Sequence, residues 1–209
     1  MSSENFLIEP ETSRLRLRQW REGDLAPFAA LNADPEVMAH FPAPLSRAES
    51  YAMATRIRGL IAERGWGFWA VEVKAEASLQ ASLQASLQAS LQASLPASFI
   101  GFVGLHIPRD DLPFAPCVEI GWRLARPYWG HGYAREAAEA ALAAAFDSLG
   151  LDEVVSFTSL DNRRSRAVMA RLGMRHDGTF EHPALPPGHP LRPHCLYRLG
   201  AAAWRGARR

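Results

Sequence analysis

The sequence has very little cysteine, a single lysine and no long hydrophobic run, and each absence excludes a class of protein. Cys117 and Cys195 are the two cysteines among 209 residues. They are too few and too far apart to indicate a disulfide framework or a zinc knuckle. Lys74 is the single lysine, and no motif around it indicates a phosphate clamp or a Schiff base. No segment approaches the roughly 18 apolar residues that a membrane span requires.

An excess of charge of one sign is also missing. The formal net charge is +1, which provides no general attraction to polyanions, so neither nucleic acid nor a membrane is expected as a partner. The N-terminus, MSSENFLIEP, lacks the basic start and apolar run of a secretory leader, so a cytoplasmic protein is expected. With 48% hydrophobic and 22% charged residues, the chain can bury one sizeable core, and a single domain is expected.

Hydrophobic periodicity predicts a mixed order of strands and helices. Residues 14–20 alternate arginine with leucine, which is typical of a half-buried strand. Residues 47–64 fit a long helix, with Ser46 as its N-cap and Gly65 just past its end. The complete expected order is strand 14–20, helices 24–32 and 47–64, strands 67–74, 98–107 and 117–124, helix 132–149, strand 153–159, helix 163–172, and strands 174–181 and 193–199. This order predicts an α+β domain over residues 11–200, with helices on the faces of a mixed sheet.

Residues 77–97 form a low-complexity insertion between two expected strands. The tetrapeptide ASLQ occurs four times there and is followed by ASLP. Alternation at period two fits a strand, whereas leucine at every fourth position fits a helix. Composition favours the helix, because Ala, Leu and Gln are good helix formers. Two roles stay open for the insertion: a neutral expansion at a hairpin tip, or an element that docks on a partner. No catalytic or binding chemistry is assigned to the insertion.

The stretch PYWGHGYARE, residues 127–136, joins an apolar strand to an alanine-rich helix. A helix N-terminus attracts an anion when the backbone is accessible, and Gly130 and Gly132 remove the Cβ atoms that would block that approach. Neither a P-loop nor a dinucleotide fingerprint fits, because no lysine follows and Arg135 occupies the position of the third glycine. The two glycines alone are equally consistent with a plain tight turn. The small-residue face of the helix that follows favours an anion site.

Two motifs together resemble a known family. The run VEIGWRLARPYWGHGYAREA, followed by SLDNRRSRAVMARLGM, is similar to the GNAT superfamily of N-acetyltransferases, in particular the branch of ribosomal-protein N-acetyltransferases. The family's acetyl-CoA signature is Gln or Arg, two residues, Gly, one residue, then Gly or Ala. It falls here on Trp129, Gly132 and Ala134. Trp129 departs from the usual first residue, which places more of the expected diphosphate contact on the backbone N–H groups of residues 130–135.

The resemblance implies a mixed, mostly antiparallel sheet with a splayed central strand pair and helices on both faces. It also implies acetyl-CoA as co-substrate, with the pantetheine arm between strands 117–124 and 153–159, bonded to backbone near Arg123 and Leu124. Asn162 and Ser165 match the family's Asn-x-x-Ser, although both residue types also cap helices. One of Arg163, Arg164 and Arg166 is expected at the 3′-phosphate, with a solvated face as the alternative role of all three, and Arg166 is selected. The full expected set is Arg123, Leu124, Trp129, Gly130, His131, Gly132, Tyr133, Ala134, Arg135, Asn162, Ser165 and Arg166.

The resemblance places two candidate catalytic residues. Glu119 lies near the position where many family members carry a base, and a carboxylate there would remove the ammonium proton directly or through water. A structural salt bridge is the alternative role for Glu119. Ser165 matches the position proposed in this branch as proton donor to the thiolate. The alternative role for Ser165 is to position a water molecule that relays the proton. Backbone N–H groups of the splayed strand can serve the oxyanion.

The segment HPALPPGHPLRPHC, residues 182–195, has no spacing typical of a metal site, and none is expected. It is expected to form one wall of the acceptor pocket, with His182 as a second candidate base. Trp20 and Phe41 are expected at the other wall, with plain core packing as their alternative.

The leading hypothesis is therefore an acetyl-CoA-dependent N-acetyltransferase that moves an acetyl group directly to a primary amine of a small molecule or a peptide N-terminus. A non-catalytic CoA-binding module and a scaffold protein are the rival classes. The acceptor's identity and the oligomeric state stay open, because pocket shape comes from loops that no motif describes.

Overall fold

A seven-stranded sheet runs through the molecule, in the order β1-β2-β3-β4-β5-β7-β6. The structure, a computed structural model, describes residues 6–74 and 98–207. Adjacent strands are antiparallel except for the parallel pair β4–β5, which confirms the α+β class and the mostly antiparallel sheet. The strands are β1 Leu15–Arg18, β2 Phe68–Val73, β3 Ser98–His106, β4 Glu119–Leu124, β5 Glu153–Ser159, β6 Arg175–Glu181 and β7 Pro193–Gly200.

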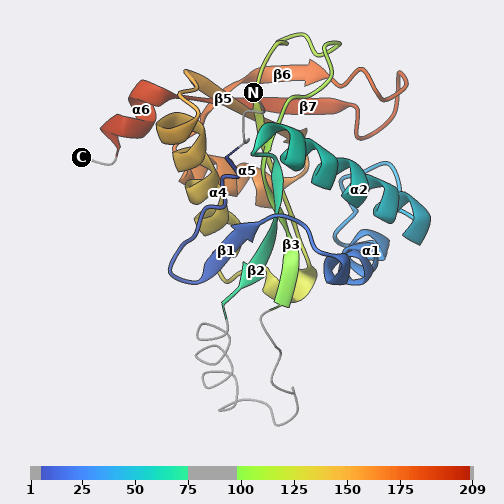
Figure 1. Cartoon of the computed structure of the whole chain (residues 1–209). Helices are drawn as coiled ribbons and strands as arrows, with labels where there is room; N and C mark the ends of the chain where they lie inside the picture. The colour runs from blue at the N-terminus through green and yellow to red at the C-terminus, as the bar shows by residue number, and fades with distance from the viewer. Residues whose placement is uncertain (1–5, 75–97, 208–209) are drawn as a thin grey trace, which may run out of the picture.

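Helices cover both sides of this sheet. Helices α1 and α2 lie on one side of the strands β1 to β3, and α4 lies on the other (Figure 1). The α-helices are α1 Leu25–Ala33, α2 Arg47–Arg64, α4 Tyr133–Ala143, α5 Arg163–Arg171 and α6 Ala201–Gly206, with short turns η1 Glu22–Asp24, η2 Arg126–Tyr128 and η3 Ala144–Ser148. None of the helices in the described ranges is long and apolar enough to cross a bilayer.

Helices α2 and α4 show how local sequence sets these elements. The Ser46 side chain accepts a hydrogen bond from the Glu49 N–H, and Gly65 ends α2 in a left-handed conformation, as the sequence predicts. In α4, Ala137, Ala138 and Ala141 are completely buried, so this small-residue face packs closely against β3 and β4. The helix expected over residues 132–149 changes into a π-helical turn at η3, and α6 is an element that the sequence analysis missed.

Strands β4 and β5 part almost as soon as they meet. Glu119 and Val155 are the one Cα pair between them in the described residues, with the Val155 N–H bonded to the Val118 C=O at 2.9 Å. On its other side, β4 pairs with β3 along its whole length, and β5 likewise pairs with β7. The splayed central pair that the family resemblance implies is therefore present, and the gap opens from residue 120 onward.

The backbone of β4 presents polar groups to this gap. The Ala125 N–H donates to the Ile100 C=O on the β3 side. Because peptide groups alternate in direction along an antiparallel ladder, the backbone of Arg123 also faces β3, whereas Trp122 and Leu124 face the gap. An extended chain lying in the gap would find partners in both backbone groups of Trp122 and in the N–H of Leu124, whose C=O already accepts a hydrogen bond from the Trp129 side chain.

The ASLQ insertion, residues 77–97, lies outside the described residues. The strands on either side of it, β2 and β3, pair antiparallel with Val73 opposite Ser98.

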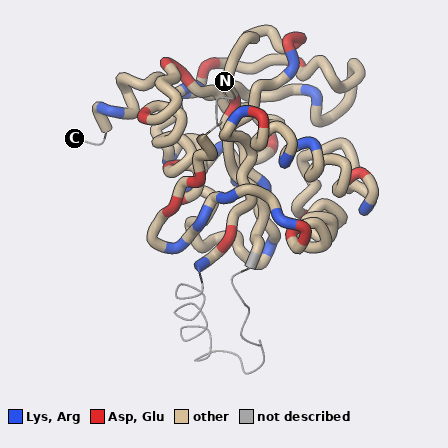
Figure 2. The backbone as a smooth tube through the Cα atoms, viewed as in Figure 1, with Lys and Arg blue, Asp and Glu red and all other residues tan. Residues whose placement is uncertain are grey.

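A buried ionic cluster fixes β1 to the turn that follows it. Basic and acidic residues are interspersed along the chain in Figure 2, and most of their ion pairs lie at the surface. Arg18 is the exception: its guanidinium contacts Asp24 and Glu72, each at 2.7 Å, and the three side chains are 5–6% exposed. Arg16, two residues earlier, pairs with Glu11 at 2.7 Å, but its side chain is 41% exposed.

Replacing Arg18 by Met should destabilise the protein strongly, because it leaves buried Asp24 without its cation and leaves buried Glu72 only the longer contacts with the more exposed Arg21 and Arg16, at 3.2 and 3.5 Å. We expect the free energy of unfolding to fall by about 3–5 kcal/mol, measured by urea denaturation. Arg16→Met on the same strand is the control: it removes the exposed ion pair with Glu11 and one 3.5 Å contact with Glu72, and it should cost less than about 1 kcal/mol. Equal losses in the two variants would contradict a stabilising role for the buried cluster.

Candidate functional site

A cavity of about 1080 Å³ lies where β4 and β5 part. It is bounded by the loop after α1, the β4 strand, the loop leading into α4, the start of α5 and the loop between β6 and β7. Of the residues expected from the sequence, those that line it are Phe41, Glu119, Arg123, Leu124, Trp129, Gly130, Gly132, Tyr133, Ala134, Arg135, Asn162, Ser165 and His182. Trp20, His131 and Arg166 are not among the lining residues.

The start of α4 presents accessible backbone to the cavity. Gly132 is the N-cap with φ 81°, and Gly130 has φ 82°, so both glycines adopt the left-handed region that other residues avoid. A Cβ atom at Gly130 would meet nothing within 4 Å. The first intrahelical bond is donated by the Glu136 N–H to the Gly132 C=O, so the amides before it have no partner within the helix. An open helix N-terminus of this kind is a general type of anion-binding site in proteins.

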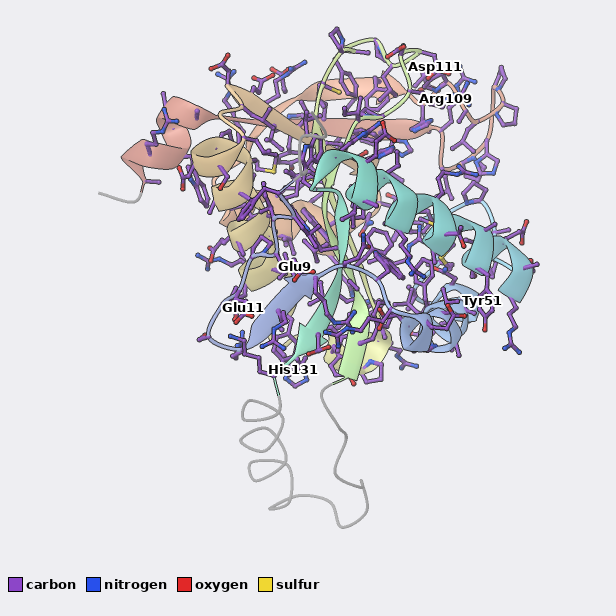
Figure 3. All side chains as sticks on the ribbon, viewed as in Figure 1. Glu9, Glu11, Tyr51, Arg109, Asp111 and His131 are labelled. Atoms are coloured by element: carbon purple, nitrogen blue, oxygen red, sulfur yellow. The ribbon has the colours of Figure 1, made fainter. Side chains whose placement is uncertain are left out.

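Arg14 holds this loop in place from the start of β1. Its Nε donates to the Glu136 carboxylate at 2.6 Å, and its Nη1 donates to the His131 carbonyl at 3.1 Å. Its guanidinium carbon lies 4.6 Å from the centroid of the Tyr133 ring. His131 thus contributes its carbonyl to the contacts with Arg14, while its side chain lies below β1 in Figure 3. In the sequence, Arg14 is one member of an alternating strand pattern, and that pattern gives no indication of this role.

Trp129 joins the two sequence motifs. Its indole Nε1–H donates to the Leu124 C=O at 2.8 Å, which fixes the loop to the end of β4. The Arg164 guanidinium lies over its ring at 4.5 Å from the centroid, at a distance typical of a cation–π contact. An aromatic residue at this position therefore connects α5 to the α4 loop instead of offering a polar side chain to a ligand.

The start of α5 has the capping geometry that the sequence left as an alternative. The Asn162 Oδ1 accepts a hydrogen bond from the Ser165 N–H at 3.2 Å, and the Asn162 Nδ2 donates to the Thr158 Oγ1 at 2.9 Å. The Ser165 side chain still lines the cavity. Asn162 therefore orients the first turn of α5 so that Ser165 faces the gap.

Arg166, the arginine selected from the sequence for the cofactor phosphate, is not among the residues that line the cavity. Its Nη1 donates to the Leu160 C=O at 3.0 Å, and a hydrogen bond with Tyr197 raises the pKa of its guanidinium. Arg163, Arg164 and Arg171 line the cavity instead. Which arginine faces the gap depends on its position around one turn of α5. The sequence has three arginines within four residues of this turn and does not show which of them faces the gap.

Glu119 lies at the point where the two strands part, with its carboxyl group in the cavity wall. Burial raises the pKa of this carboxyl to about 8. Its carboxylate forms no ion pair with any residue in the described ranges, so the salt bridge considered as an alternative is not observed there. A carboxyl group that titrates near neutrality beside a cavity has the properties of a general base.

Arg123 contributes a side chain to the cavity, whereas its backbone bonds to β3. The expected backbone contact with an extended ligand therefore shifts from Arg123 to its neighbours Trp122 and Leu124. Side chains two apart on a strand share a face, so Arg123 lies on the same face of β4 as Glu119.

The far wall of the cavity is built from histidine and aromatic residues. His182 and His194 have ring centroids 4.8 Å apart, and burial lowers the pKa of both imidazoles. The His182 Nδ1 accepts a hydrogen bond from the Ala184 N–H at 3.2 Å. His40, which the sequence analysis did not single out, lines the cavity with its Nδ1 3.2 Å from the Ser159 Oγ.

Trp20 was expected at the acceptor wall and lies in the core instead. It is 3% exposed, and its Nε1–H donates to the Phe68 C=O at 2.8 Å. Its ring packs against Phe28 at 4.9 Å and Phe99 at 5.4 Å between centroids. The segment after strand β1 turns inward here, so Trp20 has the core-packing role that was the alternative for both residues. Phe41 is partly exposed and lines the cavity.

Comparison with known families identifies the domain. Residues 14–175 match the family model described as "Acetyltransferase (GNAT) domain". The chain belongs to the GNAT acetyltransferase family. This acetyltransferase assignment confirms the resemblance that the two motifs predicted, and it covers the cavity from β1 to the start of β6.

Individual relatives agree with the GNAT assignment. The FsC-acetyl coenzyme A-N(2)-transacetylase of Aspergillus fumigatus is 44% identical over 72 residues, which are 34% of this chain and 31% of that protein. An acetyltransferase of the GNAT family from Bacillus anthracis has a similar fold, with a TM-score of 0.70, 20% identity, and 93% of this chain and 99% of that chain covered. Mycobacterium smegmatis RimJ in complex with CoA-disulfide has a TM-score of 0.63 at 18% identity, with 93% of this chain and 90% of that chain covered.

Blocking the α4 loop should abolish CoA binding. Gly132→Trp places a large side chain where the backbone must approach a diphosphate, so we expect no heat of CoA binding by isothermal titration calorimetry. Gly150→Trp is the matched control, since Gly150 is also left-handed with φ 66°, and an added Cβ there would meet nothing within 4 Å. This control should keep the wild-type affinity. Equal CoA affinity in the two variants would rule out the loop as the binding site.

Proposed function

We propose that this protein is an acetyl-CoA-dependent N-acetyltransferase that transfers an acetyl group directly to a primary amine. One observation carries the proposal: the open glycine backbone at the start of α4, the gap between β4 and β5, and Glu119 all border the same cavity. An anion site, a slot for an extended arm and a group that accepts protons are thus arranged in the order that acetyl transfer from CoA requires.

The residues around the cavity fit the parts of CoA. The N–H groups of residues 130–135 would bind the diphosphate, and Trp122 and Leu124 would bond the pantetheine arm as an added strand. The arginines facing the cavity, Arg163, Arg164 and Arg171, are the candidates for the 3′-phosphate. In support of this assignment, β4, the loop before α4 and the start of α5 all contribute residues to the same cavity.

The transfer needs few groups from the protein. Acetyl-CoA supplies a thioester, and the amine nitrogen forms a bond to its carbonyl carbon as the carbon–sulfur bond breaks. Glu119 takes the proton that the attacking ammonium must lose, and backbone N–H groups of β4 stabilise the oxyanion. The departing sulfur receives a proton through Ser165 or a water that Ser165 positions. His182 is the second candidate for the base.

The acceptor is assigned only as an amine, of a small molecule or a peptide N-terminus. The name of the Aspergillus relative, an N(2)-transacetylase, supports a nitrogen acceptor. A CoA-binding module without catalysis is the alternative, because the cofactor loop is more sharply defined than the acid and base. The cytoplasmic location expected from the sequence is kept as part of the proposal.

A panel of primary amines separates the enzyme from the binding module. Purified protein is incubated with acetyl-CoA and each amine, and free thiol release is followed with a chromogenic disulfide reagent. The proposal expects thiol release that depends on one class of amine, with the acetylated product identified by mass spectrometry. Tight CoA binding with no amine-dependent thiol release would instead favour the non-catalytic module.

The pH dependence of the reaction should identify the base. Because burial raises the pKa of Glu119 to about 8, its carboxylate form increases as the pH rises, and kcat/KM should increase up to about pH 8 and then level off. Glu119→Gln should lower kcat by about 10²- to 10⁴-fold and remove this rise of kcat/KM with pH. Titration of the acceptor amine affects the pH profiles of the wild type and the variant equally. His182→Gln is the paired variant. A rise completed below pH 6.5 and lost in His182→Gln would assign the base to His182, whose pKa burial lowers.

A further inference from the structure

Arg123 is a buried cation without a counter-ion in the cavity wall. It is 8% exposed, and burial lowers the pKa of its guanidinium to about 10. The structure shows no carboxylate paired with it among the described residues. Arg18 is buried to a similar extent, at 4% exposed, but contacts two carboxylates. At Arg18, ion pairs within the protein offset the free-energy cost of burying the charge. At Arg123, no such ion pair is observed in the described residues, so this cost is not offset by a carboxylate.

The surroundings of Arg123 leave part of its hydrogen-bonding capacity unused. Its Nη1 donates to the Asn32 Oδ1 at 2.7 Å, and its Nε, a buried atom, has no hydrogen-bond partner among the described residues. The guanidinium carbon lies 4.0 Å from the centroid of the Phe41 ring and 5.4 Å from that of Phe102. These rings hold the guanidinium in place without accepting hydrogen bonds in its plane. A fixed, planar guanidinium with free donors is the arrangement that binds a carboxylate in bidentate fashion.

Other charges at the cavity do not supply the missing anion. Glu36 lines the cavity but pairs with Arg126 at 2.7 Å. Glu119 lies on the same face of β4, four residues away, and a strand separates such Cα atoms by roughly 13 Å. Its raised pKa also keeps this carboxyl largely neutral at pH 7. The anion that balances Arg123 is therefore expected to arrive with a ligand.

We propose that Arg123 binds a carboxylate of the acceptor, so that the substrate is an amine that also carries a carboxylate, such as an amino acid or a short peptide. This inference rests on the proposed acetyl transfer and narrows its acceptor. Glu119 and Arg123 on one face of β4 complement the two ends of such a zwitterion, the first receiving the ammonium proton and the second holding the carboxylate. The same contact also fits a carboxylate on the acyl group of a dicarboxylic acyl-CoA.

Matched acceptor pairs test this directly. Each pair contains one amine with a free carboxylate and its neutral amide, for example L-lysine with L-lysinamide, β-alanine with β-alaninamide, and dipeptides with free or amidated C-termini. With acetyl-CoA as donor, kcat/KM should be at least about tenfold higher for the carboxylate member of the best pair, as a charge-assisted hydrogen bond would give. The ratio within a pair is insensitive to the fraction of active protein.

Three variants connect this ratio to Arg123. Arg123→Gln should reduce it to about one. Asn32→Asp places a carboxylate of the protein at the guanidinium and should reduce the ratio too, while keeping the arginine and a side chain of the same shape. Arg175→Gln, which removes an exposed arginine on β6, should keep the wild-type ratio.

The outcomes separate this inference from the proposed function. Equal or better turnover of the neutral amides, or a ratio unchanged in Arg123→Gln, overturns the role of Arg123 while acetyl transfer stands. A preference for succinyl-CoA over acetyl-CoA that is lost in Arg123→Gln assigns the contact to the acyl group and overturns the acceptor assignment. No turnover of any carboxylated amine overturns the inference, and thiol release with other amines then shows whether acetyl transfer itself survives.

Discussion

The parting of β4 from β5 is the constraint on which the rest of the site depends. Each strand is paired along its outer edge, β4 with β3 and β5 with β7, so the sheet stays intact although the inner edges separate after one residue pair. Backbone N–H and C=O groups of β4 that face the gap have no partner on β5 and can bind a ligand. Because α4 follows β4 through a short turn, its open N-terminus lies at the mouth of the same gap.

Backbone groups carry most of the expected binding, and side chains mainly hold them in place. Trp129 bonds to the end of β4 and stacks with Arg164, while Arg14 links β1 to the α4 loop through Glu136 and His131. None of these contacts requires a polar side chain at the diphosphate. This explains how the departure from Gln or Arg at position 129 is compatible with the family's cofactor loop.

Local patterns predicted much of the fold because they reflect short-range physics. The N-cap at Ser46 and the glycine that ends α2, Gly65, are each set within a few residues, and both appear in the structure. The arginine–leucine alternation of β1 holds for Leu15, Arg16 and Leu17 but ends at Arg18, which is buried in an ion-pair cluster. The helix α6 was missed because its six residues have little periodicity, and it is stabilised by the packing of Trp204 against Phe146, 58 positions earlier in the numbering. The π-helical turn of η3 also escaped prediction, since nothing in its alanine-rich sequence distinguishes it from an α-helix.

The sequence by itself determined most of the elements and the family, because these depend on neighbouring residues or on motifs of fixed spacing. Only the tertiary structure decided which side chains reach the cavity. It turned Trp20 into the core and Arg166 away from the gap, and it placed Glu119 where burial raises its pKa. It also paired Arg123 with an amide oxygen 91 positions away and, within residues 6–74 and 98–207, with no carboxylate. Such pairings follow from how distant segments pack, which no local pattern records.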